Sequence, residues 1–126
     1  MVLLAASQKT MSVAELARCE QVPTEFLKKI MQVLKNSQFI ESVQGPFGGY
    51  KLTRNPEETT LYEIITAVQG PIHMNICFAH PSVCEGSDTC LLREMLGEIG
   101  CQIKDYLENV TLEDMMVRMK EKAQNK

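Results

Sequence analysis

The chain has 126 residues, which suits a single domain with room for one long additional helix and is too short for several domains. Hydrophobic residues make up 44% and charged residues 23%, the balance of a globular protein with a modest core. No apolar run approaches the roughly 20 residues that span a membrane, and the opening MVLLAA lacks the basic flank and cleavage region of a signal peptide. We therefore expect a cytoplasmic protein without a membrane segment.

The formal net charge of −3 argues weakly against nucleic acid as a partner, but the charge is unevenly distributed. Basic residues outnumber acidic ones between Lys9 and Arg54, whereas the rest of the chain is acidic. Such asymmetry allows one face of an acidic protein to meet DNA.

The first two expected helices are short. Residues 1–7 are interpreted as the second half of a core helix whose first half is missing from this sequence. Ser12 and Glu15 have the spacing of a capping box and open a helix in which Cys19 is expected to be a small core residue. The expected inward side of this helix consists of Val13, Leu16 and Ala17.

The third expected helix is amphipathic and is predicted from Pro23 to Asn36, after a turn at residues 20–22. Its expected apolar face consists of Phe26, Leu27, Ile30, Val33 and Leu34. The opposite face carries residue types that contact phosphates and base edges: Glu25, Lys28, Lys29, Gln32 and Asn36. The pattern is typical of a helix-turn-helix, and the alternative is two core helices of another helical protein.

The spacing of the apolar residues changes after Ser37. The new pattern predicts two short strands around a glycine-rich turn, GPFGG. A hairpin directly after a helix makes a wing. The glycines do not form a nucleotide loop, because no GK[ST] ending and no helix follow them.

Two further helices with capping boxes are expected, starting after Thr60 and Thr111, the first ending at Gly70-Pro71. Between them runs a helix of roughly 20 residues and about 30 Å. Its apolar seam is expected to consist of Leu92, Leu96, Ile99, Ile103, Tyr106 and Val110. This seam predicts pairing with a second copy, with Gly97, Gly100 and Cys101 at a close crossing, and the alternative is a helix folded back on its own domain.

Three of the five cysteines, Cys77, Cys84 and Cys90, stand close together in a stretch without visible period. Thiolates at this separation can converge on one metal or cluster. The spacing differs from the C-x2-C pairs of zinc ribbons, although His80 could complete a zinc site, and uncoordinated thiols are the other alternative.

The pieces FLKKIMQVLKN, GPFGGYKL, the LYEII helix with its GP and the cysteine triplet resemble the Rrf-two family of bacterial winged-helix regulators, with IscR-like and NsrR-like members. The resemblance covers nearly the whole chain. It implies a mostly α fold with a small β-hairpin wing and a long C-terminal helix that forms a homodimer. The expected parts are a DNA-binding domain (1–71), a sensor loop (72–90) and a dimerisation and C-terminal helix (91–126).

The resemblance also implies site residues. The helix from Pro23 would enter the major groove of a double-stranded DNA operator, and the wing would reach the minor groove. The implied DNA contacts, with Gln32 added from the polar face, are Thr24, Glu25, Lys28, Lys29, Gln32, Gln44, Gly45, Phe47, Gly48, Gly49 and Tyr50. The implied dimerisation residues are Leu92, Leu96, Ile99, Ile103 and Tyr106.

Cys77, Cys84 and Cys90 match the residues that hold a 2Fe-2S or 4Fe-4S cluster in the iron-sulfur members of the family. The fourth ligand is open: Arg93 stands where IscR-like proteins place a histidine, and His80 is one candidate. Gln44 replaces the arginine often found in the wing.

The sequence thus predicts a repressor whose DNA affinity depends on an iron-sulfur cluster that senses iron, nitric oxide or redox state. The alternative is a cluster-free regulator of the same fold, controlled by a thiol switch or a partner. No enzyme is expected, because no Ser-His-Asp or Cys-His arrangement stands out.

Overall fold

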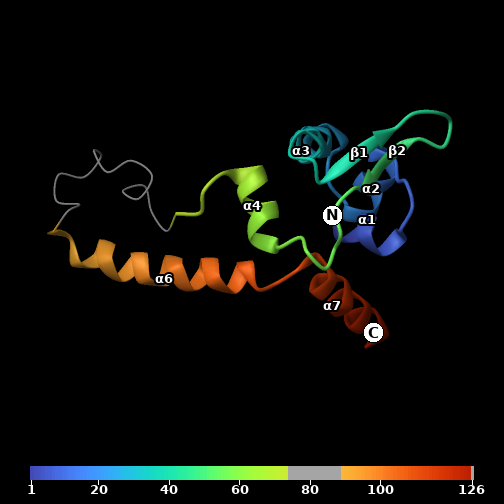
Figure 1. Cartoon of the computed structure of the whole chain (residues 1–126). Coiled ribbons are helices and arrows are strands. Elements are labelled where there is room, and N and C mark those ends of the chain that lie inside the picture. The colour runs from blue at the N-terminus through green and yellow to red at the C-terminus, as the bar shows by residue number, and fades with distance from the viewer. Residues whose placement is uncertain (74–88, 126) are drawn as a thin grey trace.

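The structure is a computed structural model that describes residues 1–73 and 89–125. Its helices are α1 (Val2–Ser7), α2 (Val13–Glu20), α3 (Thr24–Asn36), α4 (Leu61–Gln69), α6 (Leu91–Glu108) and α7 (Leu112–Gln124). Its strands are β1 (Ile40–Val43) and β2 (Gly49–Leu52), which form an antiparallel hairpin. Figure 1 shows α1, α2, α3 and the hairpin gathered at one end of the molecule, while α6 extends away from them.

Three helices start at the capping boxes that the sequence predicts. In each box the cap side chain accepts a hydrogen bond from the N–H three residues later, and the acidic side chain there accepts one from the N–H of the cap residue. The pairs are Ser12 with Glu15, Thr60 with Glu63, and Thr111 with Asp114. The predicted starts of α2, α4 and α7 are therefore confirmed.

The main core lies between the winged-helix elements. It consists of Leu4, Leu16, Met31, Leu34, Phe39 and Ile40, each at most 4% exposed. Ile64, Ala67 and Val68 of α4 pack against this core from the side. Burial of these side chains fixes α3 with its polar face toward solvent.

A second buried cluster joins the two ends of the chain. Ala5 of α1 packs with Leu112 and Met116 of α7. The backbone N–H of Leu61 donates to the carbonyl oxygen of Val110 at 2.8 Å, and that of Leu112 donates to Thr59 at 2.9 Å. These contacts attach α7 to the winged-helix elements.

Two expected burial positions and one helix assignment are wrong. Phe26 is 55% exposed, because it lies in the first turn of α3, about 140° around the helix from Met31. Cys19 is exposed, because it lies about 200° around α2 from the buried Ala17. Val110 lies beyond α6, which ends at Glu108, and is buried near the start of α7.

None of the helices in the described ranges combines the length and hydrophobicity needed to cross a lipid bilayer.

Candidate nucleic-acid interface

The turn between α2 and α3 sets the position of the second helix. Gln21 adopts a left-handed conformation (φ 56°), and the N–H of Val22 donates to the carbonyl oxygen of Ala17 at 3.1 Å. Pro23 then occupies the N-cap of α3. Two packed helices joined by so short a turn form a helix-turn-helix, with α3 as the second helix.

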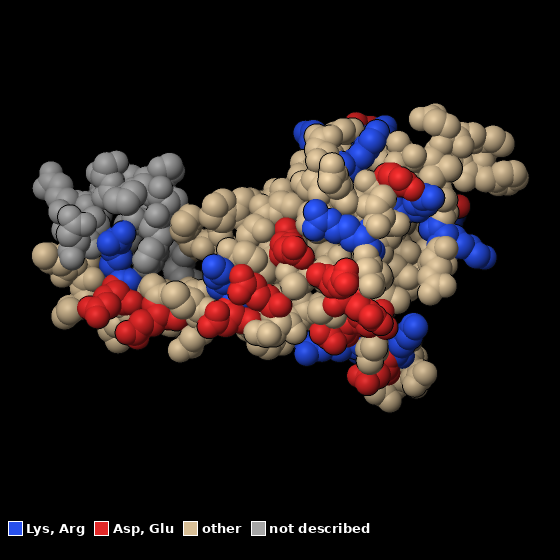
Figure 2. Space-filling model, in the orientation of Figure 1, with Lys and Arg blue, Asp and Glu red and all other residues tan. Residues whose placement is uncertain are grey.

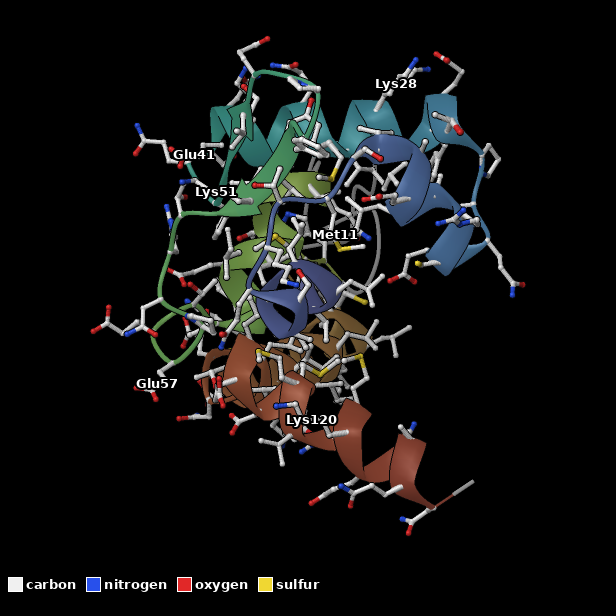
Figure 3. The ribbon with its side chains drawn as sticks, turned by 90° about the vertical axis from the view of Figure 1, so that its right-hand side faces the viewer. Met11, Lys28, Glu41, Lys51, Glu57 and Lys120 are labelled. Atoms are coloured by element: carbon white, nitrogen blue, oxygen red, sulfur yellow. The ribbon has the colours of Figure 1, made fainter. Side chains whose placement is uncertain are left out.

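The outward face of α3 is polar and exposed throughout. The exposed side chains are those of Thr24, Glu25, Lys28, Lys29, Gln32 and Asn36. Lys28 Nζ lies 3.1 Å from Glu25 Oε1, with the two side chains 56% and 83% exposed, and Gln32 Nε2 donates to Asn36 Oδ1 at 3.0 Å. Figure 3 shows Lys28 pointing away from the body of the protein. An ion pair this exposed contributes little to stability, so Lys28 is free to exchange Glu25 for a phosphate.

The wing is held at its base by a third piece of extended chain. Met11 and Tyr50 form an antiparallel bridge, with N–H to carbonyl distances of 2.9 Å and 2.8 Å in the two directions. Gly49 has φ +149°, and a Cβ there would lie 2.3 Å from the carbonyl oxygen of Met11. Only glycine allows this close approach of the two backbones.

Arg54 ties the wing to the neighbouring helices. Its guanidinium lies 4.1 Å from the centre of the Phe39 ring, donates to the carbonyl oxygen of Ser37 at 3.2 Å and lies 3.8 Å from Glu63. The sequence analysis assigned no role to Arg54 or Met11. No local pattern identifies them, since each acts on residues distant in the sequence.

The two parts of the predicted DNA surface lie on one edge of the molecule. In Figure 3, α3 and the turn between β1 and β2 both lie along the upper edge, whereas α7 lies at the opposite end. Figure 2 shows mostly blue side chains with a few red ones over α3 and the hairpin, and mostly red side chains with a few blue ones over α6 and below it. The charge separation expected from the sequence is thus present in space, and α3 with the wing presents the face best suited to DNA.

The candidate metal ligands are only partly within the described residues. Cys77, Cys84 and His80 lie outside them. Cys90 is half-buried, directly precedes α6 and makes no side-chain capping bond. Figure 1 places this end of α6 farthest from α3 and the wing.

The predicted dimerisation residues divide between two faces of α6. Leu92, Ile99 and Tyr106 are 61%, 44% and 58% exposed, whereas Leu96 and Ile103 are half-buried. Leu96 lines a cavity of about 330 Å³ between α4 and α6, together with Tyr62, Ile72, His73, Gly97, Gly100, Cys101 and Lys104. Met95, which the predicted seam does not include, is 62% exposed and joins Leu92, Ile99 and Tyr106 at spacings of three, four and seven.

The end of α6 also contacts α7. Two effects of Tyr106 raise the pKa of Arg118 above its ordinary value. The larger is a hydrogen bond, and the next is the electrostatic effect of the same tyrosine. Tyr106 therefore links the exposed face of α6 to the C-terminal helix.

Comparison with known proteins gives consistent matches. The family described as "Rrf2: Iron-dependent Transcriptional regulator" matches residues 1–118. A putative HTH-type transcriptional regulator from Aquifex aeolicus is 28% identical over 110 residues, covering 86% of this chain and 76% of the relative. The HTH-type transcriptional regulator IscR from Pectobacterium atrosepticum is 27% identical over 115 residues, covering 91% of this chain and 70% of the relative.

Solved structures show the same fold. CymR (YrzC), described as the global cysteine regulator of B. subtilis, superimposes with a TM-score of 0.73 at 24% identity, covering 93% of this chain and 87% of CymR. IscR of T. potens superimposes with a TM-score of 0.73 at 21% identity, covering 98% of this chain and 82% of that one. The predicted winged-helix fold is confirmed, and the chain belongs to the Rrf2 (Rrf-two) family of helix-turn-helix transcriptional regulators.

Proposed function

We propose that this regulator is a homodimeric repressor that reads a palindromic operator. In each subunit α3 enters the major groove, and the wing from Gln44 to Tyr50 meets the adjacent minor groove. The observation that carries the proposal is the shared edge of α3 and the wing, on the less acidic side of the molecule. The proposed contacts are Thr24, Glu25, Lys28, Lys29 and Gln32 on α3, with Gln44, Gly45, Phe47, Gly48, Gly49 and Tyr50 in the wing.

The exposed face of α6 supports the homodimer. Leu92, Met95, Ile99 and Tyr106 leave an apolar stripe on a helix of 18 residues. A stripe with spacings of three and four is the pattern by which two helices pack along each other. Pairing of α6 with α6 of a second copy would cover this stripe and fix the separation of the two α3 helices.

We further propose that Cys77, Cys84 and Cys90 supply three of the ligands of an iron-sulfur cluster, for which cysteine thiolates, ordinarily four, are the donors. Cys90 fits this role, because its side chain is partly accessible and serves no capping function. The family description "Iron-dependent Transcriptional regulator" also supports it. When bound, such a cluster supplies redox chemistry and reactivity toward nitric oxide.

Regulation would pass through α6. One end of this helix directly follows Cys90, and the other end leads to the bridge between Thr60 and Thr111. A ligand that fixes the position of Cys90 would shift the equilibrium between orientations of α6, and hence the separation of the reading helices. Iron supply, nitric oxide and redox stress are compatible signals, and the protein would act in the cytoplasm.

A second candidate is a cluster-free regulator controlled by thiol chemistry. Cys19 and Cys101 are both free and exposed, and Cys101 lines the cavity between α4 and α6. Exposed thiols are the ones open to oxidation.

The two candidates differ in one experiment. The full chain is prepared without oxygen, and its visible and electron paramagnetic resonance spectra are recorded together with iron and sulfide content. Sulfur-to-iron charge-transfer bands that are lost in Cys84→Ala support the cluster. A colourless, iron-free protein that still binds its operator contradicts the cluster and favours the thiol switch.

A further inference from the structure

We propose that Phe47 is an apolar wedge that enters the minor groove and partly unstacks one base step. This inference rests on the DNA-reading function proposed above and deepens it. It assigns Phe47 the role of an intercalating side chain and predicts a preference for deformable DNA.

Phe47 is far more exposed than ordinary packing explains. It is 92% exposed, the highest value among the large hydrophobic side chains that the structure describes. A phenyl ring in water gains from burial, so its position at the outermost turn of the wing favours an apolar binding surface there.

The turn fixes the backbone that carries the ring before any partner arrives. The N–H of Gly48 donates to the carbonyl oxygen of Gly45 at 3.0 Å, which closes a β-turn with Pro46 and Phe47 at its two central positions. The proline ring fixes one backbone angle. A Cβ at Gly48 would lie 2.3 Å from the carbonyl oxygen of Val43, so the turn packs tightly on its own strand. A backbone ordered in this way loses little further entropy when the side chain that it carries binds.

The chemistry of the turn favours insertion over charge attraction. Residues 44–50 carry no charged side chain, so the wing tip has no arginine or lysine to place in the groove. Proteins that bind the minor groove frequently insert phenylalanine or other apolar side chains between base steps. The glycines on both sides of the turn leave room for the sugar walls of the groove.

The same edge of the molecule presents α3. In Figure 1 the turn between β1 and β2 projects away from α3, and in Figure 3 both lie along the same upper edge, so a duplex seated on α3 and extending along that edge would pass within reach of Phe47. Pyrimidine–purine steps such as TA unstack at least cost, whereas A-tracts resist. Phe47 would therefore favour operators with a flexible step beneath the wing, although it forms no hydrogen bond with a base.

The test uses the full chain and a duplex that it selects from a random pool. The adenine analogue 2-aminopurine, which brightens when unstacked, replaces adenine at successive positions beneath the wing. Binding of the wild-type protein should brighten one position several-fold. Phe47→Ala should abolish the signal and weaken binding about ten-fold, since base–aromatic contacts have that magnitude. The salt dependence of binding should stay unchanged, because Phe47 contacts no phosphate.

Three controls separate a wedge from general effects. Val117 of α7 is also an exposed apolar residue, at 46%, and lies away from the DNA-facing edge, so Val117→Ala should change nothing. Phe47→Leu should keep part of the signal, because leucine is still apolar. Replacing the flexible step by an A-tract should weaken the wild-type protein and leave Phe47→Ala almost unaffected.

Several outcomes would overturn the proposal. An unchanged 2-aminopurine signal in Phe47→Ala contradicts the wedge even if affinity falls. Loss of transcriptional control with unaltered duplex binding would assign Phe47 to a protein partner instead. A wild-type chain that selects no duplex would contradict the DNA-reading function itself, which distinguishes that failure from the failure of the wedge.

Discussion

Thr60 and Thr111 pair in an antiparallel bridge that joins the start of α4 to the start of α7. Both residues are also N-caps, so one short piece of backbone organises two helix starts. Thr59, which is 1% exposed, lies next to the bridge and donates from its hydroxyl to the carbonyl oxygen of Asn55 at 2.9 Å. The junction is where α6 and α7 meet the winged-helix elements.

The capping box at Thr111 should make stability depend on acid pH. Hydrogen bonds with Thr111, from its backbone first and its side chain second, hold the pKa of Asp114 below its ordinary value of 3.8. The folded state therefore favours the ionised carboxylate. This stabilisation is fully present above pH 3.8 and is lost as pH falls through the lowered pKa.

We expect Asp114→Asn to lower the melting temperature at neutral pH, with a difference from the wild type that shrinks below about pH 4. Glu121→Gln, farther along α7, serves as the control and should leave that pH dependence intact. Parallel melting curves of wild type and Asp114→Asn at every pH would contradict the role of the capping box.

Lys28→Ala should weaken operator binding and lower the slope of log affinity against log salt by about one, if Lys28 neutralises one phosphate. Lys120 is a matched control, because it is an exposed lysine of α7 at the opposite end of the molecule. Titrations at several salt concentrations measure both quantities. Equal slopes for Lys28→Ala and wild type would remove Lys28 from the phosphate contacts.

Gly49→Ala should destabilise the fold by about 3 kcal/mol, because the new methyl group meets the Met11 backbone and the φ of +149° disfavours it. Gly45 also has a positive φ, +112°, but a Cβ there has nothing within 4 Å. Gly45→Ala should therefore cost only about 1 kcal/mol. Urea unfolding measures both variants, and equal losses would show that the contact with Met11 does not matter.

Ile99→Glu should convert the proposed dimer into a monomer, because Ile99 lies within the exposed apolar stripe of α6. Met95→Glu should act in the same way. Val117→Glu places the same charge on an exposed apolar position of α7 and should remain dimeric. Sedimentation velocity distinguishes the two states, and a dimer that survives Ile99→Glu would contradict pairing through this face.

Local patterns in the sequence predicted the elements of the fold well. Capping boxes at Ser12, Thr60 and Thr111 depend on residues three apart, so the sequence contains all the information. The hairpin and α3 follow likewise from local periodicity and turn residues. The exposed face of α3 was predictable because the core side of an amphipathic helix determines the solvent side.

Long-range relationships were beyond the sequence. The bridge between Met11 and Tyr50 joins segments that share no sequence pattern. The need for glycine at position 49 becomes apparent only when the Met11 backbone is seen packed against it. The two faces of α6 could not be separated either, because Leu92 followed by Leu96 and Leu92 followed by Met95 are both helical spacings. Only the position of α4 shows that Leu96 faces inward and that Met95 faces solvent.

The length of α6 determines what kind of signal can reach the DNA. Its 18 residues extend about 27 Å from Cys90 to the junction at Thr111. Over such a lever arm, a sideways displacement of about 2 Å at the Cys90 end rotates the helix by only about 4°. If the helix pivots at the Thr111 junction, a sideways displacement at the Cys90 end reaches that junction as a change in helix angle and not as a shift. The proposed dimer, built on two such arms, would therefore respond to changes in crossing angle, and a ligand of the kind proposed at the cysteine end would act on the DNA-facing helices by setting that angle.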